Sequence, residues 1–413
     1  MADLVTIEDA LALVLDKAVP LPPETVPLAE AAGRFLAASA RSVTDLPPFP
    51  SSAMDGFAIR SADVPGPLRI VGRIAAGRPA LAALGRGEAM GIATGGVVPE
   101  GADAVVPIED VLENDNIADV ASPVQAGANV RPRGGDVHAG KDIVPAGRLL
   151  GPPQLAALAA AGVAVVRCGR RPKVTILATG SELRQPGEAL QPGEIYESNG
   201  LMLEAAVRGA GAVVDRLVSV PDDEDAHRLA LERGLAADVL VTSGGVSVGP
   251  HDLVRRLEEE LGVIEVFWGV AMRPGKPLAF GVRGSTLVFG LPGNPVSSLV
   301  GCELFVLPAI RALQGALAPG PRFERGTLGR VVRRSAARDD LVRASIELST
   351  DGMSVLWPVI GQESLLIPAI SGCASSPRRQ ATGIAQRQEV SRVVQRDLLF
   401  KTTRRSLNEK NSA

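Results

Sequence analysis

The sequence has few aromatic side chains and no excess of positive charge, and both shortages exclude functions. Only 3% of the 413 residues are aromatic, so the stacked aromatic platform that single-stranded nucleic acids require is missing. The net charge of −3 provides no general basic field to neutralise the phosphates of a duplex. We therefore expect no nucleic acid as a partner, and any anionic ligand must be small and held locally.

Cysteine is also scarce. The chain has three, and none stands in a CxxC pair: Cys168, Cys302 and Cys373. This pattern favours neither a disulfide framework nor a zinc site and fits a reducing cytoplasm. Acids at the start of the chain argue against a signal peptide. The uncharged run 149–166 is interrupted by a Pro-Pro pair and a glycine, so we expect no membrane span.

Charge is distributed unevenly between the tail and the rest of the chain. Residues 378–413 carry nine Lys or Arg and three Asp or Glu, a net charge of +6, which leaves −9 on residues 1–377. The tail has weak strand patterning. We predict that it is a divergent or disordered basic end.

The first 171 residues alternate between helical and strand patterns. Residues 7–37 show helical spacing, residues 47–145 show short apolar runs separated by Gly and Pro, and residues 152–161 return to helical composition. We predict a β-rich insert at 47–145, placed within a discontinuous N-terminal domain of residues 1–46 and 146–171.

Strands and helices alternate through residues 172–315, which predicts a central three-layer α/β domain with a mostly parallel sheet. The predicted strands are 173–178, 212–218, 238–241, 263–267 and 286–289, and the predicted helices are 201–208, 225–235, 253–261 and 295–313. Short alternating runs then predict a small C-terminal β domain at 316–377. The fold class is thus α/β and multidomain.

Polar turns follow the predicted strands, where an open parallel sheet binds its ligands. Asn294 and Pro295 are typical of the start of a helix whose positive end attracts an anion. The loop 243–249 predicts a second nest for phosphate, with Arg273 and Lys276 adding positive charge. Three acids offer the few carboxylate oxygens that Mg²⁺ takes beside water and phosphate: Glu182, Asp223 and Asp252.

Two further motifs in the sequence indicate other kinds of site. Residues 245–249 match GxSxG with Ser247 as a nucleophile, but the sole histidine after it is His251, whereas hydrolases of this type place an acid and then a histidine well downstream. Residues 135–141 match GxxxxGK but continue with Asp142 where a phosphate loop needs Ser or Thr. Both motifs are therefore disfavoured.

The β-rich insert carries candidates of its own. Asp55 lies in a tight glycine turn, Thr94 ends a short strand, and Arg131 and Asp136 flank a Gly-Gly pair. By pattern alone these are turn residues. They would serve the α/β site across a cleft, such as one between subunits.

The motifs together resemble the molybdopterin molybdenumtransferase family, which comprises the bacterial MoeA proteins and the E domain of gephyrin. The resemblance covers residues 5–370 in consistent order. It rests on Pro47-Pro48-Phe49, Ser52 to Gly56, Thr94-Gly95, Pro99 to Val105, Arg131 to Asp136, Thr179 to Leu183, Ile195-Tyr196, Ser198-Asn199, Ser243 to Gly249, Pro274 to Pro277 and Gly290 to Ser297.

This resemblance implies a cytoplasmic homodimer that binds adenylylated molybdopterin, inserts molybdate and releases AMP with the help of Mg²⁺. It implies Glu182 and Asp252 as metal ligands, Asp223 as a further acid, and Asp55, Thr94, Arg131 and Asp136 as residues supplied across the dimer. The implied cradle for phosphate, pterin and nucleotide is Ser243, Gly244, Gly245, Arg273, Lys276, Gly293, Asn294, Pro295 and Ser297.

Two positions depart from the family pattern. Gly269 and Arg273 stand where the family commonly has lysine, and Gly269 removes a donor for an oxyanion. Two other functions stay open at this level: adenylylation of molybdopterin, and a non-catalytic scaffold like gephyrin. The molybdopterin adenylyltransferase is a candidate partner.

Overall fold

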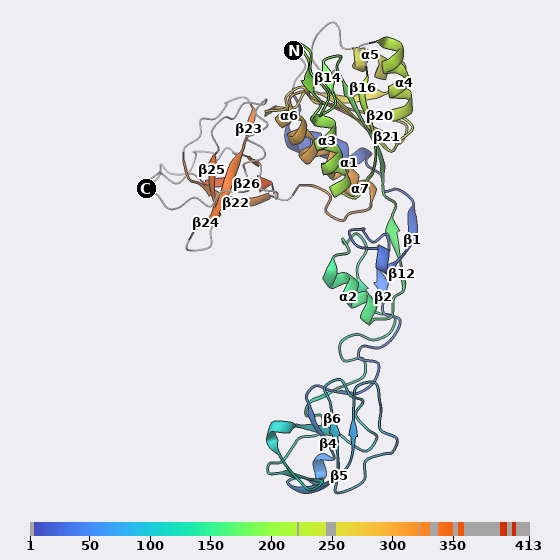
Figure 1. Ribbon diagram of the computed structural model, residues 1–413, viewed down its shortest axis with the longest axis vertical. Helices are drawn as coiled ribbons and strands as arrows, with labels where there is room; N and C mark the ends of the chain where they lie inside the picture. Colours follow the sequence, from blue (N-terminus) through green and yellow to red (C-terminus); the bar gives the residue numbers. More distant parts are fainter. Residues whose placement is uncertain are drawn as a thin grey trace, which may run out of the picture. The chain divides into compact units, whose positions relative to one another are not determined.

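The computed structural model describes residues 4–220, 223–244, 253–321, 323–330, 338–349, 354–358, 389–394 and 399–401. The chain divides into two units (Figure 1). Unit 1 comprises Met1–Glu24 and Gly169–Ala413, and unit 2 comprises Thr25–Cys168.

A six-stranded sheet forms the centre of unit 1. Its order is β16 (Val213–Val220), β13 (Lys173–Thr179), β17 (Val239–Ser243), β21 (Thr286–Leu291), β20 (Ala279–Arg283) and β18 (Ile264–Trp268). The first four strands are parallel, as predicted. Strand β20 is antiparallel to both of its neighbours, β21 and β18, so β18 runs in the same direction as the first four. Strand β20 was not predicted, because the Pro and Gly residues around position 275 are typical of a loop.

Helices cover both faces of this sheet and confirm the three-layer architecture. Helices α4 (Glu224–Gly234) and α5 (Leu253–Glu260) lie side by side on one face, and α3 (Asn199–Gly209) packs on the other (Figure 1). Strand residues alternate between the two cores, so that Val241 and Phe289 face α3 while Leu240 and Val288 face α4 and α5.

The predicted long helix at 295–313 is present with an irregular middle. It consists of α6 (Pro295–Gly301), the π-helical η4 (Cys302–Val306) and α7 (Leu307–Leu313). Pro308 has no N–H to donate to the carbonyl four residues earlier, which accounts for the changed hydrogen-bond spacing there. The helix is long and apolar enough to cross a membrane, but it is 89% buried inside the protein, as a core helix is.

The predicted N-terminal domain is only partly correct. Helix α1 (Ile7–Lys17) belongs to unit 1, because Ile7, Ala10 and Val14 are buried in the same core as α7. The second predicted helical stretch, after residue 27, is a single 3-10 turn, η1 (Leu28–Glu30).

The rest of the predicted discontinuous domain does have a core of its own within unit 2. Strand β1 (Pro23–Pro27) pairs with β12 (Val165–Gly169), and β2 (Ala40–Arg41) pairs with β11 (Asp142–Val144). Helix α2 (Pro152–Ala160) covers them through Leu158. Chain segments before and after the insert therefore pack together.

The insert is β-rich as predicted. Its six-stranded sheet has the order β7 (Ala104–Pro107), β4 (Gly56–Ile59), β6 (Glu88–Ile92), β5 (Gly66–Ile74), β9 (Ile117–Val120) and β8 (Val111–Asn114). Two short 3-10 turns, η2 (Ser61–Asp63) and η3 (Ile108–Asp110), connect its strands.

The C-terminal β domain is also present. Its sheet has the order β19 (Met272–Arg273), β23 (Asp339–Val342), β27 (Leu399–Lys401), β26 (Glu389–Val394), β22 (Phe323–Leu328), β25 (Ser354–Pro358) and β24 (Ala344–Leu348). Strands β26 and β27 lie in the segment 378–413 that was predicted to be a divergent or disordered end, and they pair with β22 and β23. The rest of residues 378–413 lies outside the described residues.

Candidate functional site

Three loops of unit 1 meet at one edge of the central sheet. Ala178 of β13 pairs with Ser243 of β17, and Ser243 pairs with Leu291 of β21. These parallel strands therefore end at the same level. The turns that follow them, at residues 179–182, 243–244 and 292–294, lie next to one another, as the sequence predicted.

Close contacts hold these loops together. The N–H of Gly244 donates to the carbonyl of Leu291 over 3.1 Å. Gly244 has φ +96°, and a Cβ there would lie 3.1 Å from the carbonyl oxygen of Thr179. A side chain would be strained and crowded at this position, which explains why glycine follows Ser243.

Asn199 connects two of the loops, a role that the sequence pattern does not indicate. Its side-chain amide donates to Ser243 Oγ over 3.0 Å and to the carbonyl of Gly293 over 2.7 Å. The available signal was a polar residue at the start of a helix that follows β13. The pairing itself joins residues 94 positions apart and is visible only in the structure.

Glu182 is exposed at the same edge. Its carboxylate folds back over Gly180, where a Cβ would lie 2.5 Å from Oε2. Its backbone carbonyl accepts from the N–H of Ile195, beside the pairing of β14 (Leu183–Arg184) with β15 (Ile195–Tyr196). The backbone of Glu182 is thus fixed just after β13, and its carboxylate is exposed there.

The acidic residues at this edge could bind a magnesium ion only if phosphate and water oxygens complete its coordination shell. Within the described ranges, no group of three or more His, Cys, Asp or Glu side chains could hold a metal alone. Mg²⁺ commonly binds one or two carboxylates together with substrate phosphates, and exposed Glu182 meets that requirement. The second predicted ligand, Asp252, and the predicted cradle residue Gly245 lie outside the described residues.

Asp223 has a structural role at the start of α4. It is the N-cap, and its carboxylate accepts from the N–H of Ala226 over 2.9 Å. The strand before it, β16, ends level with Thr179 of β13. Asp223 therefore lies on the same edge of the sheet, with one carboxylate oxygen already engaged.

The predicted anion site at the start of α6 has the expected backbone. Asn294 is the N-cap and Pro295 the first helical residue, but the Asn294 side chain makes no capping hydrogen bond. Ser297 is buried in the first turn, and its carbonyl lies 3.6 Å from where a Cβ of Gly275 would be. Lys276 is the residue after Gly275, and its side chain is exposed.

Arg273 has another partner. Its guanidinium pairs with buried Asp340 over 2.8 Å, while β19 pairs with β23. Part of its donor capacity therefore links the α/β domain to the C-terminal β domain. Gly269 also has a local reason, since it has φ +87° and a Cβ there would lie 2.8 Å from Leu4 Cδ2.

The predicted residues of the insert gather in unit 2. Asp55 Oδ1 accepts from the backbone N–H of Thr94 over 2.7 Å and from its hydroxyl over 3.1 Å. Arg131 and Asp136 form an ion pair. Strand β3 (Ser51–Ser52) joins these two pairs, because it pairs with β10 (Val130–Arg131) and bonds to the backbone of Gly95.

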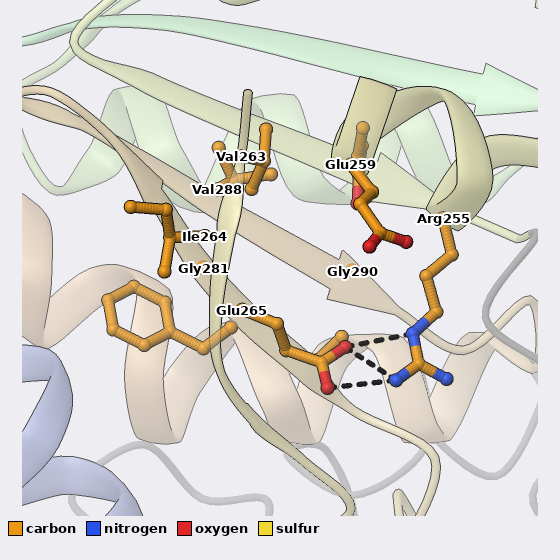
Figure 2. A pocket seen from close by; sticks show the side chains of 11 residues that line it. Arg255, Glu259, Val263, Ile264, Glu265, Gly281, Val288 and Gly290 are labelled. Atoms are coloured by element: carbon orange, nitrogen blue, oxygen red, sulfur yellow. Dashed lines mark hydrogen bonds and ion pairs between the residues drawn. The ribbon is translucent and has the colours of Figure 1, made fainter. Parts of the chain in front are cut away.

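A separate pocket of about 350 Å³ lies between α5 and strands β18, β20 and β21 (Figure 2). Gly281 and Gly290 contribute no side chains to it, and Arg255 pairs with Glu265 through two hydrogen bonds of 2.8 Å. Figure 2 shows the carboxylate of Glu265 turned toward the guanidinium of Arg255, with the carboxylate of Glu259 above it. Glu258 also lines it, so the pocket is acidic and unsuited to phosphate.

The three-layer fold with polar loops at the ends of its parallel strands defines a class of α/β proteins that bind their ligands at this edge of the sheet, and comparison with known proteins identifies the family within that class. Residues 5–162 match the MoeA N-terminal region (domain I and II), and residues 175–312 match a probable molybdopterin binding domain. A molybdopterin molybdenumtransferase 2 of Mycobacterium tuberculosis is 38% identical over 313 residues, which are 72% of this chain and 76% of that protein. The Haemophilus influenzae molybdopterin molybdenumtransferase is 37% identical over 76% of this chain and 78% of its own length.

Solved structures agree with this assignment. A MoeA protein from Pyrococcus horikoshii OT3 has a TM-score of 0.77 at 26% identity and covers 97% of this chain and 98% of its own. A second Pyrococcus structure has a TM-score of 0.72 at 32% identity and covers 87% and 90%. The chain belongs to the MoeA family of molybdopterin molybdenumtransferases, which are enzymes of molybdenum cofactor biosynthesis.

Proposed function

We propose that this protein inserts molybdate into adenylylated molybdopterin and releases AMP. The observation that carries the proposal is the meeting of three polar loops at one sheet edge, with Asn199 bonding the Ser243 turn to the Gly293 turn. A ligand with two linked phosphates needs several donors at one place, and successive strand ends supply them.

The proposed roles follow from the geometry. The first turn of α6, which has no side-chain cap, holds phosphate oxygens together with Ser297 and Lys276. Ser243, Gly244 and Gly245 form the base of this phosphate site. Glu182 and Asp252 are the proposed magnesium ligands, and bound Mg²⁺ would neutralise charge that develops on the phosphate oxygens. The dithiol of the pterin forms two Mo–S bonds while one molybdate oxygen leaves with the two thiol protons as water. A water molecule cleaves the phosphoanhydride bond between the pterin phosphate and AMP, so that each product keeps its own phosphate.

The direct test measures AMP release. Purified protein is mixed with adenylylated molybdopterin, molybdate and Mg²⁺, and AMP is followed by chromatography. We expect release that depends on molybdate and falls at least tenfold in Glu182→Gln. Release of no AMP, or production of adenylylated pterin from MgATP instead, would refute the proposal.

The proposed assembly is a cytoplasmic homodimer in which the Asp55 group of one subunit serves the other. Complementation tests this arrangement, because mixed dimers of Asp55→Ala and Glu182→Ala subunits would contain one intact site. Re-equilibrated equal mixtures should recover roughly a quarter of wild-type activity, since half of the dimers are mixed and each has one of two sites intact. Mixtures as inactive as the separate variants would contradict the arrangement.

A further inference from the structure

Asn199 is the first residue of α3, and its side chain faces the loops rather than its own helix. Both side-chain N–H groups are used, one on Ser243 Oγ and one on the carbonyl of Gly293. A carbonyl oxygen can only accept, so the amide nitrogen must point toward it and the orientation of the amide is determined.

The bond to Ser243 has a chemical consequence. Because Ser243 Oγ accepts from Asn199, its own O–H is left to donate. Ser243 is buried at the end of β17, beside the turn at residues 292–294. The hydroxyl is thus set as a donor at the edge where phosphate oxygens are proposed to bind.

A buried ion pair holds Asn199 in place. Glu197, with a side chain only 1% exposed, accepts from the N–H of Gly200 and pairs with Arg216 over 3.2 Å. Arg216 also pairs with Glu204 over 3.0 Å, one turn along α3. The start of α3 is therefore anchored to β16 on one side while Asn199 reaches the loops on the other.

We propose that Asn199 is a positioning residue, which fixes the distance between the Ser243 and Gly293 turns and presents the Ser243 hydroxyl as a donor to the phosphate of the pterin substrate. This proposal rests on the proposed function for the identity of the substrate. The mechanical part of it, the coupling of the two turns, does not depend on the reaction.

The test uses the full-length protein with Asn199→Asp and Asn199→Ala. Asp keeps the size but cannot donate to the Gly293 carbonyl, and Ala removes the link without adding charge. Asn114→Asp is the matched control, since Asn114 is exposed in β8 of unit 2.

Hydrogen exchange tests the coupling of the turns without substrate. We expect amides in peptides 239–244 and 286–294 to exchange at least tenfold faster in both Asn199 variants, and at the wild-type rate in Asn114→Asp. Unchanged exchange in both variants would overturn the proposal, whatever the activity of the wild type. Faster exchange with no AMP release by the wild type would instead refute the proposed function alone.

Kinetics then test the role of Ser243. Loss of two hydrogen bonds predicts at least a tenfold fall in kcat/KM for AMP release in Asn199→Ala. If Asn199 acts through Ser243, the same change made in a Ser243→Ala background has a smaller effect, and a double-mutant cycle measures the difference. Effects that simply multiply would overturn the role of the hydroxyl.

Discussion

Replacing Glu197 by Gln should destabilise unit 1 specifically. The variant keeps an acceptor for the N–H of Gly200 but places an amide where the carboxylate faced Arg216. Breaking a buried ion pair by removing one partner costs about 3–5 kcal/mol. Arg216 is 25% exposed and retains Glu204, so we expect a smaller loss of about 2 kcal/mol, within the range of about 1.5–3 kcal/mol for hydrogen bonds to charged groups.

The two tryptophans allow the stability of unit 1 to be measured separately from that of unit 2. Trp268 and Trp357 both belong to unit 1, so thermal unfolding followed by tryptophan fluorescence reports that unit. For a unit of this size, a loss of 2 kcal/mol lowers the midpoint by about 4–8 °C. Far-UV circular dichroism reports both units.

The control is Glu113→Gln, which removes a carboxylate paired with Arg73 in unit 2. The side chains of Arg73 and Glu113 are 60% and 37% exposed, so we expect a loss of less than about 1 kcal/mol and no change in the tryptophan transition. A shift below 1 °C in Glu197→Gln would show that the buried carboxylate stabilises the fold no more than an amide does, and the anchoring argument for α3 would be wrong.

Three further predictions concern other parts of the chain. Gly56→Ala should destabilise unit 2 by about 3 kcal/mol, because the new Cβ would lie 1.9 Å from the Val106 carbonyl oxygen. Gly72→Ala is the control, since a Cβ there meets nothing within 4 Å. Thermal unfolding followed by circular dichroism should show a loss of stability in Gly56→Ala alone. Asp223→Asn should keep the α4 cap and Asp223→Ala should lose about 1 kcal/mol; AMP release by Asp223→Asn equal to wild type would limit Asp223 to capping. Burial raises the pKa of the Cys302 thiol, so peptide mapping after maleimide treatment at pH 8 should find it unlabelled until the protein unfolds, and native labelling would contradict its burial.

Much of the central fold could be predicted because its signals are local. The apolar runs of β13, β17 and β21 and the helical stretches between them repeat over short distances, and a backbone with that periodicity has few alternatives. Asn294 before Pro295 likewise predicts a helix start from two adjacent residues. The predictions failed where local pattern was weak, at β20, or where packing decided membership, as for α1.

The sequence alone determined where the strands end, because Gly, Pro and short polar residues mark the turns. Such turns must satisfy the hydrogen bonds of their own backbone and adopt tight conformations. Only the tertiary structure decided which of those turns touch. Asn199 meets Ser243 and Gly293 because strand order and register place three separate strand ends at one level. Register results from side-chain packing on both faces of the sheet, between segments far apart along the chain, and no local pattern encodes it.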